Sequence, residues 1–328
     1  MKRKNVHPFC TSRRLASALL SAALLYGAFL SAVLWKKSAQ PVFSETSASR
    51  TETVSSAGGE RSGTAESVSA FVPVGEDECL PAAASSGGAM GWYFKKTDDH
   101  SQPPLDAPLA YVETLDGYYL DHAAKDDDRV IYLTFDAGYE NGNVEKVLDA
   151  LKKHNAKGAF FVLSHLVESN TALVRRMAEE GHLVCNHTCR HKDMTSVSGE
   201  TFKEELCNLE TLYREKTGKT LAPYFRPPEG KFDKISLSRA QKLGYKTIFW
   251  SYAYCDWDND RQPAPDAAYE NLLAHTHNGM VLLLHPTSAT NAEILDRLLT
   301  AWGEQGYRFG TLDELTARNA GQTGDETR

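Results

Sequence analysis

Short apolar segments alternate with amphipathic segments from about residue 130 onward, and this alternation constrains the fold more than any other feature. Apolar strands alternating with helices indicate a parallel sheet covered by helices, and about seven or eight such units close most readily as a (β/α) barrel. The predicted strands are 130–135, 159–163, 182–185, 224–225, 246–251, 280–284 and 307–309, and the predicted helices are 143–155, 171–180, 199–217, 234–243, 267–275 and 291–304.

An open, doubly wound sheet is the competing architecture for such a pattern. It commonly binds a dinucleotide at a Gly-x-Gly-x-x-Gly turn after the first strand, and no such turn follows residue 135, so we expect no dinucleotide. Acidic residues outnumber basic ones by 43 to 36, and the net charge is −7. A chain of this charge is a poor partner for phosphate backbones, so we expect no nucleic-acid ligand.

The amino-terminal segment has the pattern of a membrane-targeting sequence. A basic head at residues 1–14 precedes an uncharged run at 15–35, and Lys36 and Lys37 follow at once. A helix over this run would be roughly 30 Å long, enough to cross the hydrocarbon of a bilayer. The more basic head should stay in the cytoplasm, so the pattern predicts an uncleaved signal-anchor with the body exported. The alternative is a cleaved signal peptide and a secreted body.

The remaining chain divides by composition. Residues 36–90 are rich in Ser, Ala, Thr, Gly and Glu and are predicted to be a disordered linker. Residues 91–127 form a proline-containing lead-in expected to pack on the main domain at 128–315, and 316–328 is predicted to be a flexible tail. A disulfide between two of the four cysteines of the main domain is conceivable, but the spacing assigns no pair; these are Cys185, Cys189, Cys207 and Cys255.

Ionisable residues follow five of the predicted strands. In a parallel barrel these strand ends open onto one face, where the reaction centres of such barrels lie. Convergence from five separate strands is a more specific signal than any single motif. The residues are Asp136, the pair His187 and His191, Arg226, Asp256 with Trp257, and His285.

The two histidines could bind one divalent ion if their segment makes a single helical turn. Cys185 and Cys189 alternate with them, so a structural zinc site is an alternative, although Cys185 fits better as a small core residue. Asp136 could ligate a metal, act as a general base or cap the next helix.

The other strand-end residues also have two interpretations each. His285 could be a general acid or a buried structural histidine. Arg226 could hold the carboxylate of a base or tie loops together, and Asp256 could orient either of these two residues. Trp257 and Tyr254 could line a carbohydrate cleft or belong to the core.

These residues, in this order, resemble the five sequence blocks of the polysaccharide deacetylase family (NodB-type, carbohydrate esterase family 4). The resemblance implies a distorted, partly open (β/α) barrel, the NodB homology fold, and hydrolysis of N-acetyl groups on a glycan. The matching segments are T-F-D-A-G at 134–138, H-T-C-R-H at 187–191, R-P-P-E-G at 226–230, D-W at 256–257 and L-L-L-H at 282–285.

The segment T-F-D-A-G-Y-E-N-G at 134–142 is similar to a subgroup, the delta-lactam-forming peptidoglycan muramic-acid deacetylases of sporulating bacteria. This resemblance implies a peptidoglycan strand as substrate, a muramic lactam of spore cortex as the final product, and a monomeric enzyme. It also implies roles for individual residues: Asp136 as general base, His285 as general acid, His187 and His191 as metal ligands, and Arg226, Pro228, Asp256, Trp257 and Tyr139 as supporting or substrate-binding residues.

Ala137 departs from the family pattern, because most members have a metal-binding Asp at this position. The family implies a divalent ion, Zn²⁺ or otherwise Mn²⁺, Co²⁺ or Mg²⁺. Two imidazoles make a weaker site than two imidazoles and a carboxylate, so we expect reduced metal affinity.

Two other functions are compatible with these residues. A glycosidase would use two carboxylates, Asp136 with Glu140 or Glu229, and would cleave the glycan chain without releasing acetate. A non-catalytic module would bind peptidoglycan without releasing acetate.

Overall fold

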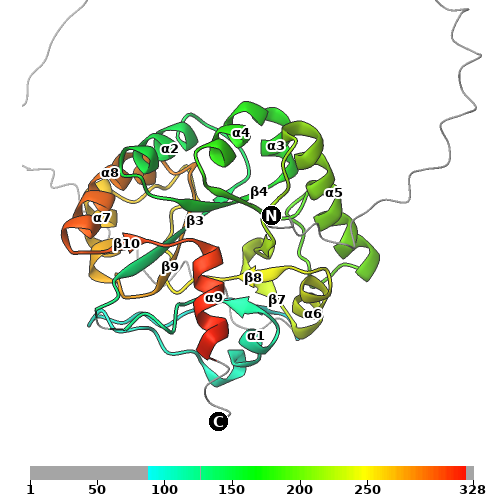
Figure 1. The fold of residues 1–328 in the computed structure, drawn as a ribbon, viewed down its shortest axis with the longest axis horizontal. Helices are drawn as coiled ribbons and strands as arrows, with labels where there is room; N and C mark the ends of the chain where they lie inside the picture. The colour runs from blue at the N-terminus through cyan, green and yellow to red at the C-terminus, as the bar shows by residue number, and fades with distance from the viewer. Residues whose placement is uncertain (1–87, 126, 323–328) are drawn as a thin grey trace, which may run out of the picture. The chain divides into compact units, whose positions relative to one another are not determined.

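The computed structural model describes residues 88–125 and 127–322, and its elements follow the predicted alternation (Figure 1). The strands are β1 (Met90–Gly91), β2 (Gly117–Tyr118), β3 (Val130–Ala137), β4 (Gly158–Val162), β5 (Leu183–Asn186), β6 (Tyr224–Phe225), β7 (Lys231–Phe232), β8 (Lys246–Ile248), β9 (Met280–Leu284) and β10 (Arg308–Phe309). The α-helices are α1 (Tyr111–Thr114), α2 (Val144–Lys153), α3 (Ser164–Ser169), α4 (Thr171–Glu179), α5 (Gly199–Thr217), α6 (Lys234–Lys242), α7 (Pro265–Ala274), α8 (Ala289–Glu304) and α9 (Leu312–Gln322), and the short 3₁₀ helices are Ala107–Leu109 and Pro228–Gly230.

The predicted head, signal-anchor and nearly all of the linker lie outside the described residues. Among the residues that are described, no helix is both long enough and apolar enough to cross a bilayer.

The main sheet has the order β10-β3-β4-β5-β6-β8-β2, and β9 pairs with β3. All the strand pairings in this sheet are parallel. A single bridge between Tyr252 and Leu282 joins the segment after β8 to β9, so the sheet curls round toward β3. The sheet is therefore a curled, parallel half-barrel: the alternation predicted the parallel strands, and the partly open form is the one that the family resemblance implied.

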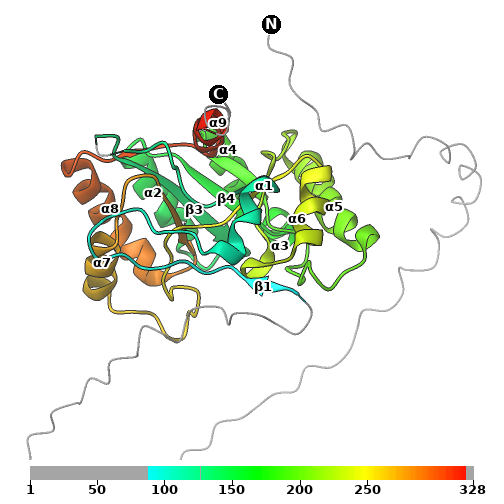
Figure 2. The same cartoon turned by 90° about the horizontal axis from the view of Figure 1, so that it is seen from below.

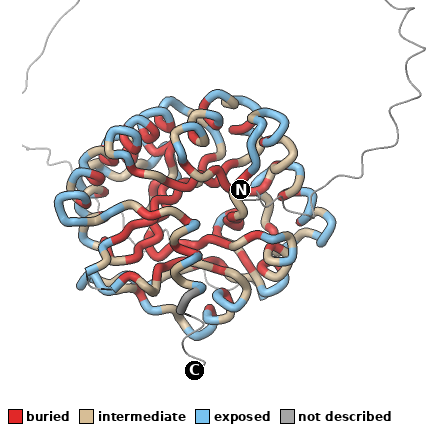
Figure 3. The backbone as a smooth tube through the Cα atoms, in the orientation of Figure 1, coloured by how far each residue is buried: buried red, intermediate tan, exposed pale blue. Residues whose placement is uncertain are grey.

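The alternation of side chains along β3 divides the core into two layers. Ile131, Leu133 and Phe135 pack with residues of α2, α4 and α8 on the helix-covered side. Val130 and Tyr132 belong to a second cluster that lines the inside of the curled sheet. Because successive strand residues point to opposite faces, Asp136 faces the same side as Val130 and Tyr132. Figure 3 shows the buried residues along the central strands and the exposed residues on the surrounding helices.

The two ends of the barrel differ. Residues 310–313 at the start of α9 line a cavity with the first residues of β4 and β5, so α9 covers the amino ends of the strands. Strand β1 pairs with β7, which follows the loop after β6, at the carboxyl ends. Figure 2 shows α9 and β1 at opposite ends of the barrel.

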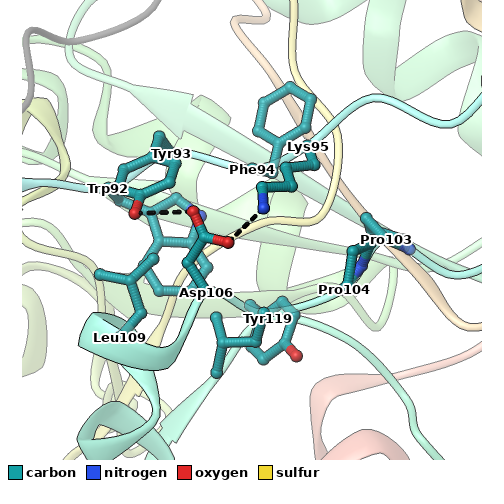
Figure 4. Close-up of a pocket in the computed structure, with 10 residues that line it drawn as sticks. Trp92, Tyr93, Phe94, Lys95, Pro103, Pro104, Asp106, Leu109 and Tyr119 are labelled. Carbon is teal, nitrogen blue, oxygen red and sulfur yellow. Dashed lines mark hydrogen bonds and ion pairs between the residues drawn. The ribbon is translucent and has the colours of Figure 1, made fainter.

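The lead-in is integral to the barrel. It contributes β2, which pairs with β8, and it buries Trp92 completely against Phe249, at 4.3 Å between ring centroids. The indole Nε1–H of Trp92 donates to the carbonyl of Trp250 (2.8 Å). A small hollow beside Trp92 is closed by polar contacts of Tyr93 and Lys95 with Asp106 (Figure 4).

We expect Trp92→Ala to lower the free energy of unfolding by about 3–5 kcal/mol, because it removes a large buried ring and leaves the Trp250 carbonyl without its donor. Urea denaturation of the full-length protein measures this. The matched control is Trp257→Ala, which removes the same side chain from a position that is 56% exposed and should change stability by no more than about 0.5 kcal/mol. Equal losses in both variants would contradict an anchoring role of the lead-in.

Two predicted boundaries and one predicted loop conformation differ notably in the structure. The strand predicted over 246–251 ends at Ile248: Phe249 makes the last ladder bond to Tyr118 of β2, and Ser251 donates instead to Val281 of β9, so the chain changes its partner strand here. The predicted tail begins at residue 316, but α9 continues to Gln322 and Asn319 donates to the carbonyl of Leu120 (2.7 Å). The His187–His191 segment is an irregular loop and makes no helical turn.

Candidate active site

Four strand ends bring ionisable side chains together at the carboxyl end of the barrel. Asp136 lies near the end of β3, and Arg226 directly follows β6 and donates through Nη1 to Asp136 Oδ1 (2.8 Å). His187 follows β5 and places its Nε2 atom 3.6 Å from Asp136 Oδ2. His285 follows β9 and is close enough for its charge to lower the pKa of Asp136. The predicted convergence of these four residues is therefore found.

Arg226 is fully buried and fixed by bonds from each part of its guanidinium group. Its Nε donates to the carbonyl of Ile248 (3.0 Å), and its Nη2 donates to the Thr134 hydroxyl (2.8 Å). Its planar group also lies 4.3 Å from the ring centroid of Phe161. Of the two predicted roles, holding the carboxylate of Asp136 is the one that the geometry supports.

The conformation of the loop after Arg226 requires glycine at position 230. This glycine has φ +64°, and a Cβ atom there would lie 2.7 Å from Trp250. Pro228 is buried within the same loop, and the backbone N–H of Trp92 donates to the Gly230 carbonyl (2.9 Å). The lead-in therefore stabilises the loop that carries Arg226.

Asp136 is ionised at neutral pH. Burial raises the pKa of its carboxyl group, but the charge and the hydrogen bond of Arg226, together with the charge of His285, outweigh burial, so the pKa lies below its usual value. An ionised carboxylate that is aligned by a buried Arg can accept a proton. Asp136 does not cap the next helix: Glu140 accepts a hydrogen bond from the Val144 N–H (3.2 Å) at the start of α2.

The loop that carries His187 and His191 has two residues in the left-handed region, Thr188 at φ +74° and His191 at φ +53°. A β-branched residue with positive φ is strained, and such strain persists only where the surroundings enforce it. Fully buried Glu205 of α5 supplies the support: its carboxylate accepts from the N–H (2.9 Å) and Nε (2.8 Å) of Arg190. The two imidazoles lie 5.0 Å apart between centroids without the helical turn that their spacing suggests.

The histidine pair fits a divalent ion that accepts nitrogen ligands. His187 Nδ1 lies 2.9 Å from the Arg226 carbonyl, which can only accept, so Nδ1 carries the proton and Nε2 keeps its lone pair. Burial lowers the pKa of His187 to about 4, which keeps the ring neutral. Within residues 88–125 and 127–322, no group of three or more His, Cys, Asp or Glu side chains could hold a metal. The side chains here that could hold an ion are therefore the two imidazoles.

The alternative zinc site with Cys185 and Cys189 is wrong for these residues. Cys185 is a free thiol, fully buried among apolar side chains such as Tyr224 and Phe161. Cys189 is also free, and burial raises the pKa of its thiol to about 11. The two thiols pack in different core clusters, Cys185 inside the curled sheet and Cys189 against the helix-covered side, so they do not face one ion.

Asp256 and His285 form a hydrogen-bonded pair. Asp256 is almost fully buried, and its two oxygens accept from Nδ1 (2.8 Å) and from the backbone N–H (2.7 Å) of His285. Burial lowers the pKa of His285, but the charges of Asp256 and Asp136 outweigh burial and raise it. Because Nδ1–H is held by Asp256, the Nε2 atom is the one available to exchange a proton. Of its two predicted roles, Asp256 therefore orients His285.

Two aromatic side chains near these residues are exposed, Trp257 (56%) and Tyr139 (41%). Tyr139 accepts a hydrogen bond from Asn259, which joins the loop after β3 to the loop carrying Trp257. Exposed aromatic faces suit contact with a sugar ring. Tyr254 is partly buried and its hydroxyl donates to Asn291, so it belongs to the support of the site rather than to an exposed wall.

The second carboxylate that a glycosidase needs is poorly placed. Glu140 caps α2, as described above, and Glu229 is 59% exposed and paired with Lys231 (2.7 Å). Neither makes a described contact with Asp136. The geometry therefore favours a carboxylate and an imidazole as the pair of proton carriers.

Sequence reasoning missed several residues that hold the site: Thr134 as an acceptor for Arg226, Phe161 and Trp250 beside its guanidinium group, Glu205 and Asn291. Thr134 lies within a quoted motif and could have been considered. Phe161, Trp250 and Glu205 lie 15 or more residues from the side chains that they contact, and Asn291, six residues after His285, is in none of the quoted motifs.

The chain is similar to known proteins in both sequence and fold. Residues 123–248 match the family model described as polysaccharide deacetylase. The peptidoglycan-N-acetylmuramic acid deacetylase PdaA of Bacillus subtilis (strain 168) is 38% identical over 248 residues, which cover 72% of this chain and 93% of that protein. The solved structure of B. subtilis PdaA, a family 4 carbohydrate esterase, has a TM-score of 0.67 at 38% identity over 70% of this chain and 98% of that one.

A second solved structure, a family 4 carbohydrate esterase from Bacillus anthracis, is 33% identical with a TM-score of 0.58, over 70% of this chain and 97% of that one. The family model ends at Ile248, before Asp256 and His285. His285 follows β9, which pairs with β3 of the matched region, and Asp256 is hydrogen-bonded to His285.

Proposed function

The chain belongs to the polysaccharide deacetylase family, and from this premise we propose that it hydrolyses N-acetyl groups of peptidoglycan sugars, most specifically those of N-acetylmuramic acid. The main support for the proposal is that the site pairs a carboxylate that can accept a proton with a histidine that can donate one. Asp136 is held ionised by Arg226, whereas His285 is held by Asp256 with a raised pKa. A base and an acid on one face suit amide hydrolysis.

A divalent ion, with Zn²⁺ as the first choice for imidazole ligands, would be held by His187 and His191. When bound, it would supply a Lewis acid that makes water more acidic and polarises the acetyl carbonyl group.

The proton transfers fall to the chain's own residues. Asp136 accepts a proton from the water that attacks the acetyl carbon, and Arg226 keeps its carboxylate aligned for this. His285 donates a proton from Nε2 to the amide nitrogen as the C–N bond breaks. Acetate leaves, and the sugar retains a free amine.

The muramic sugar is proposed on two grounds. The segment 134–142 is similar to the delta-lactam-forming subgroup, and PdaA carries muramic acid deacetylase in its name. A free amine on a muramic residue lies beside the lactyl carboxyl group of the same sugar. We propose that the two groups close to the delta-lactam of spore cortex after deacetylation.

We also propose that the enzyme works outside the cytoplasm, as a monomer. The uncharged run at 15–35 and the basic head before it suggest a single-pass anchor, or a cleaved signal with a secreted body. Either arrangement gives the domain access to the cell wall.

Incubation of the full-length protein with peptide-stripped peptidoglycan tests the proposal. We expect release of acetate, and mass spectrometry of the glycan fragments should show the loss of acetyl groups from muramic residues and then the loss of water. New reducing ends without acetate would instead indicate a glycosidase. Binding without either product, across a series of divalent metals, would indicate a glycan-binding module.

We expect Ala137→Asp to tighten Zn²⁺ binding about tenfold or more, because a carboxylate at this position would add a third protein ligand. Calorimetric titration of the metal-free protein with Zn²⁺ measures this. Ala137 is fully buried, so an added carboxylate that fails to reach the ion would be buried without a partner and would lower the melting temperature. Unchanged affinity together with a lower melting temperature would show that position 137 does not face the ion.

A further inference from the structure

Asn291, near the start of α8, contacts both Asp256 and His285. It lies outside the five sequence blocks that resemble the family. It is 1% exposed. Its Nδ2 donates to Asp256 Oδ2 (2.6 Å) and to the backbone carbonyl of His285 (3.0 Å). These contacts join a helix to two residues that lie on loops.

The orientation of this amide is fixed by its partners. A carboxylate and a carbonyl can only accept, so both hydrogens of Nδ2 are directed to them. Oδ1 then accepts from the hydroxyl of Tyr254. The backbone N–H of Asn291 donates to Ser288 Oγ (3.0 Å), which caps the amino end of α8. The amide therefore has all its hydrogen bonds made and lies on a well-defined helix start.

The backbone of Asp256 is held within the loop after β8 by hydrogen bonds with the Tyr254 carbonyl (2.9 Å) and the Gln262 amide (2.9 Å), but these do not touch its carboxylate. Its carboxylate accepts three bonds, two from His285 and one from Asn291. Only the bond from Asn291 comes from a packed helix. Without it, the carboxylate could rotate away from the plane in which it receives the Nδ1–H of His285.

We propose that Asn291 is a positioning residue for the general acid: it holds the Asp256 carboxylate so that His285 keeps its proton on Nδ1 toward Asp256 and its Nε2 toward the substrate. This inference rests on the proposed deacetylase function for its kinetic consequence. Its structural consequence is the position of the proton on the His285 ring, which can be measured without substrate.

The test uses the full-length protein with Asn291→Ala. We expect kcat for acetate release to fall about tenfold to a hundredfold with little change in KM, because supporting contacts around an active histidine have effects of this size. In the ¹⁵N-histidine spectrum of the substrate-free and metal-free protein, we expect the wild type to show a slowly exchanging Nδ1–H signal of His285. The variant should lose that signal.

A matched control separates this effect from general loosening of the loop. Asn143 donates through its amide to the Thr287 carbonyl (3.0 Å), on the loop after β9 that carries His285. It makes no described contact with Asp256. Asn143→Ala should keep both kcat and the Nδ1–H signal. Equal losses in both variants would overturn the proposal.

A second variant covers the case in which Asn291→Ala does not fold. Tyr254→Phe removes only the hydroxyl that holds Oδ1 of Asn291, and it should reduce kcat and speed exchange of the Nδ1–H to a smaller degree. An unchanged signal in a folded Asn291→Ala protein, or in Tyr254→Phe where the first variant fails, would overturn the role. If the wild type releases no acetate, the deacetylase function fails, and the spectra still decide whether Asn291 holds the pair.

Discussion

The Asp136→Asn variant is expected to lose about 10³- to 10⁴-fold in kcat while keeping its fold, because an amide cannot accept the proton of water. The fold should persist for a specific reason. The Asn side-chain oxygen can still accept from Nη1 of Arg226, and Arg226 keeps its bonds to Ile248 and Thr134. Acetate release measures the loss, and circular dichroism with thermal unfolding checks the fold.

The companion variant Asp256→Asn helps to interpret this result. It also replaces a buried carboxylate by an amide, but it acts on the acid rather than on the base. Since the Asp256 charge helps to raise the pKa of His285, its loss should shift the alkaline limit of activity to lower pH. An Asp136→Asn protein that is folded and retains wild-type kcat would remove Asp136 from the mechanism.

Much of the fold follows from local patterns in the sequence. The helix over 199–217 is found with the predicted bounds, because Ser198 caps its start and Gly218, with φ +72°, ends it. Strand β9 is found as predicted because five consecutive apolar residues suit a strand buried on both faces. Strand β2 could not be predicted, since two residues in an irregular segment give no period, and its place depends on pairing with β8.

The candidate site was predictable to a similar depth. Residues at the carboxyl ends of parallel strands must share one face, and this rule alone brings together Asp136, Arg226 and His285. The conformation of the histidine loop was not predictable. A spacing of four suggests a helical turn, but buried Glu205 and the left-handed Thr188 produce the same proximity through an irregular loop. The spacing of residues within one segment does not show contacts of this kind with another segment.

Replacement of His285 by Gln is expected to reduce kcat about 10²- to 10³-fold, because Gln preserves a hydrogen-bond donor but cannot release a proton to the departing amine. The pH profile makes this prediction specific. In the wild type, activity should fall as pH rises through the pKa of His285, since only the protonated ring can act as an acid. That pKa is raised by Asp256 and Asp136, so the fall should begin above the pH expected for an unperturbed histidine.

The His285→Gln variant should lose this alkaline fall together with its rate, because the group that titrates is gone. The variant should still show an acidic fall, since this depends on protonation of Asp136, whose pKa is kept low chiefly by Arg226. The fall should move to somewhat higher pH, because the charge of His285 no longer helps to lower that pKa. Rates of acetate release measured at saturating substrate from pH 3, below the ordinary pKa of an aspartate, up to pH 10 test both sides. A variant that keeps the wild-type alkaline fall would show that another group donates the proton, and Tyr254, whose hydroxyl lies near Asp256, would then be the next residue to replace.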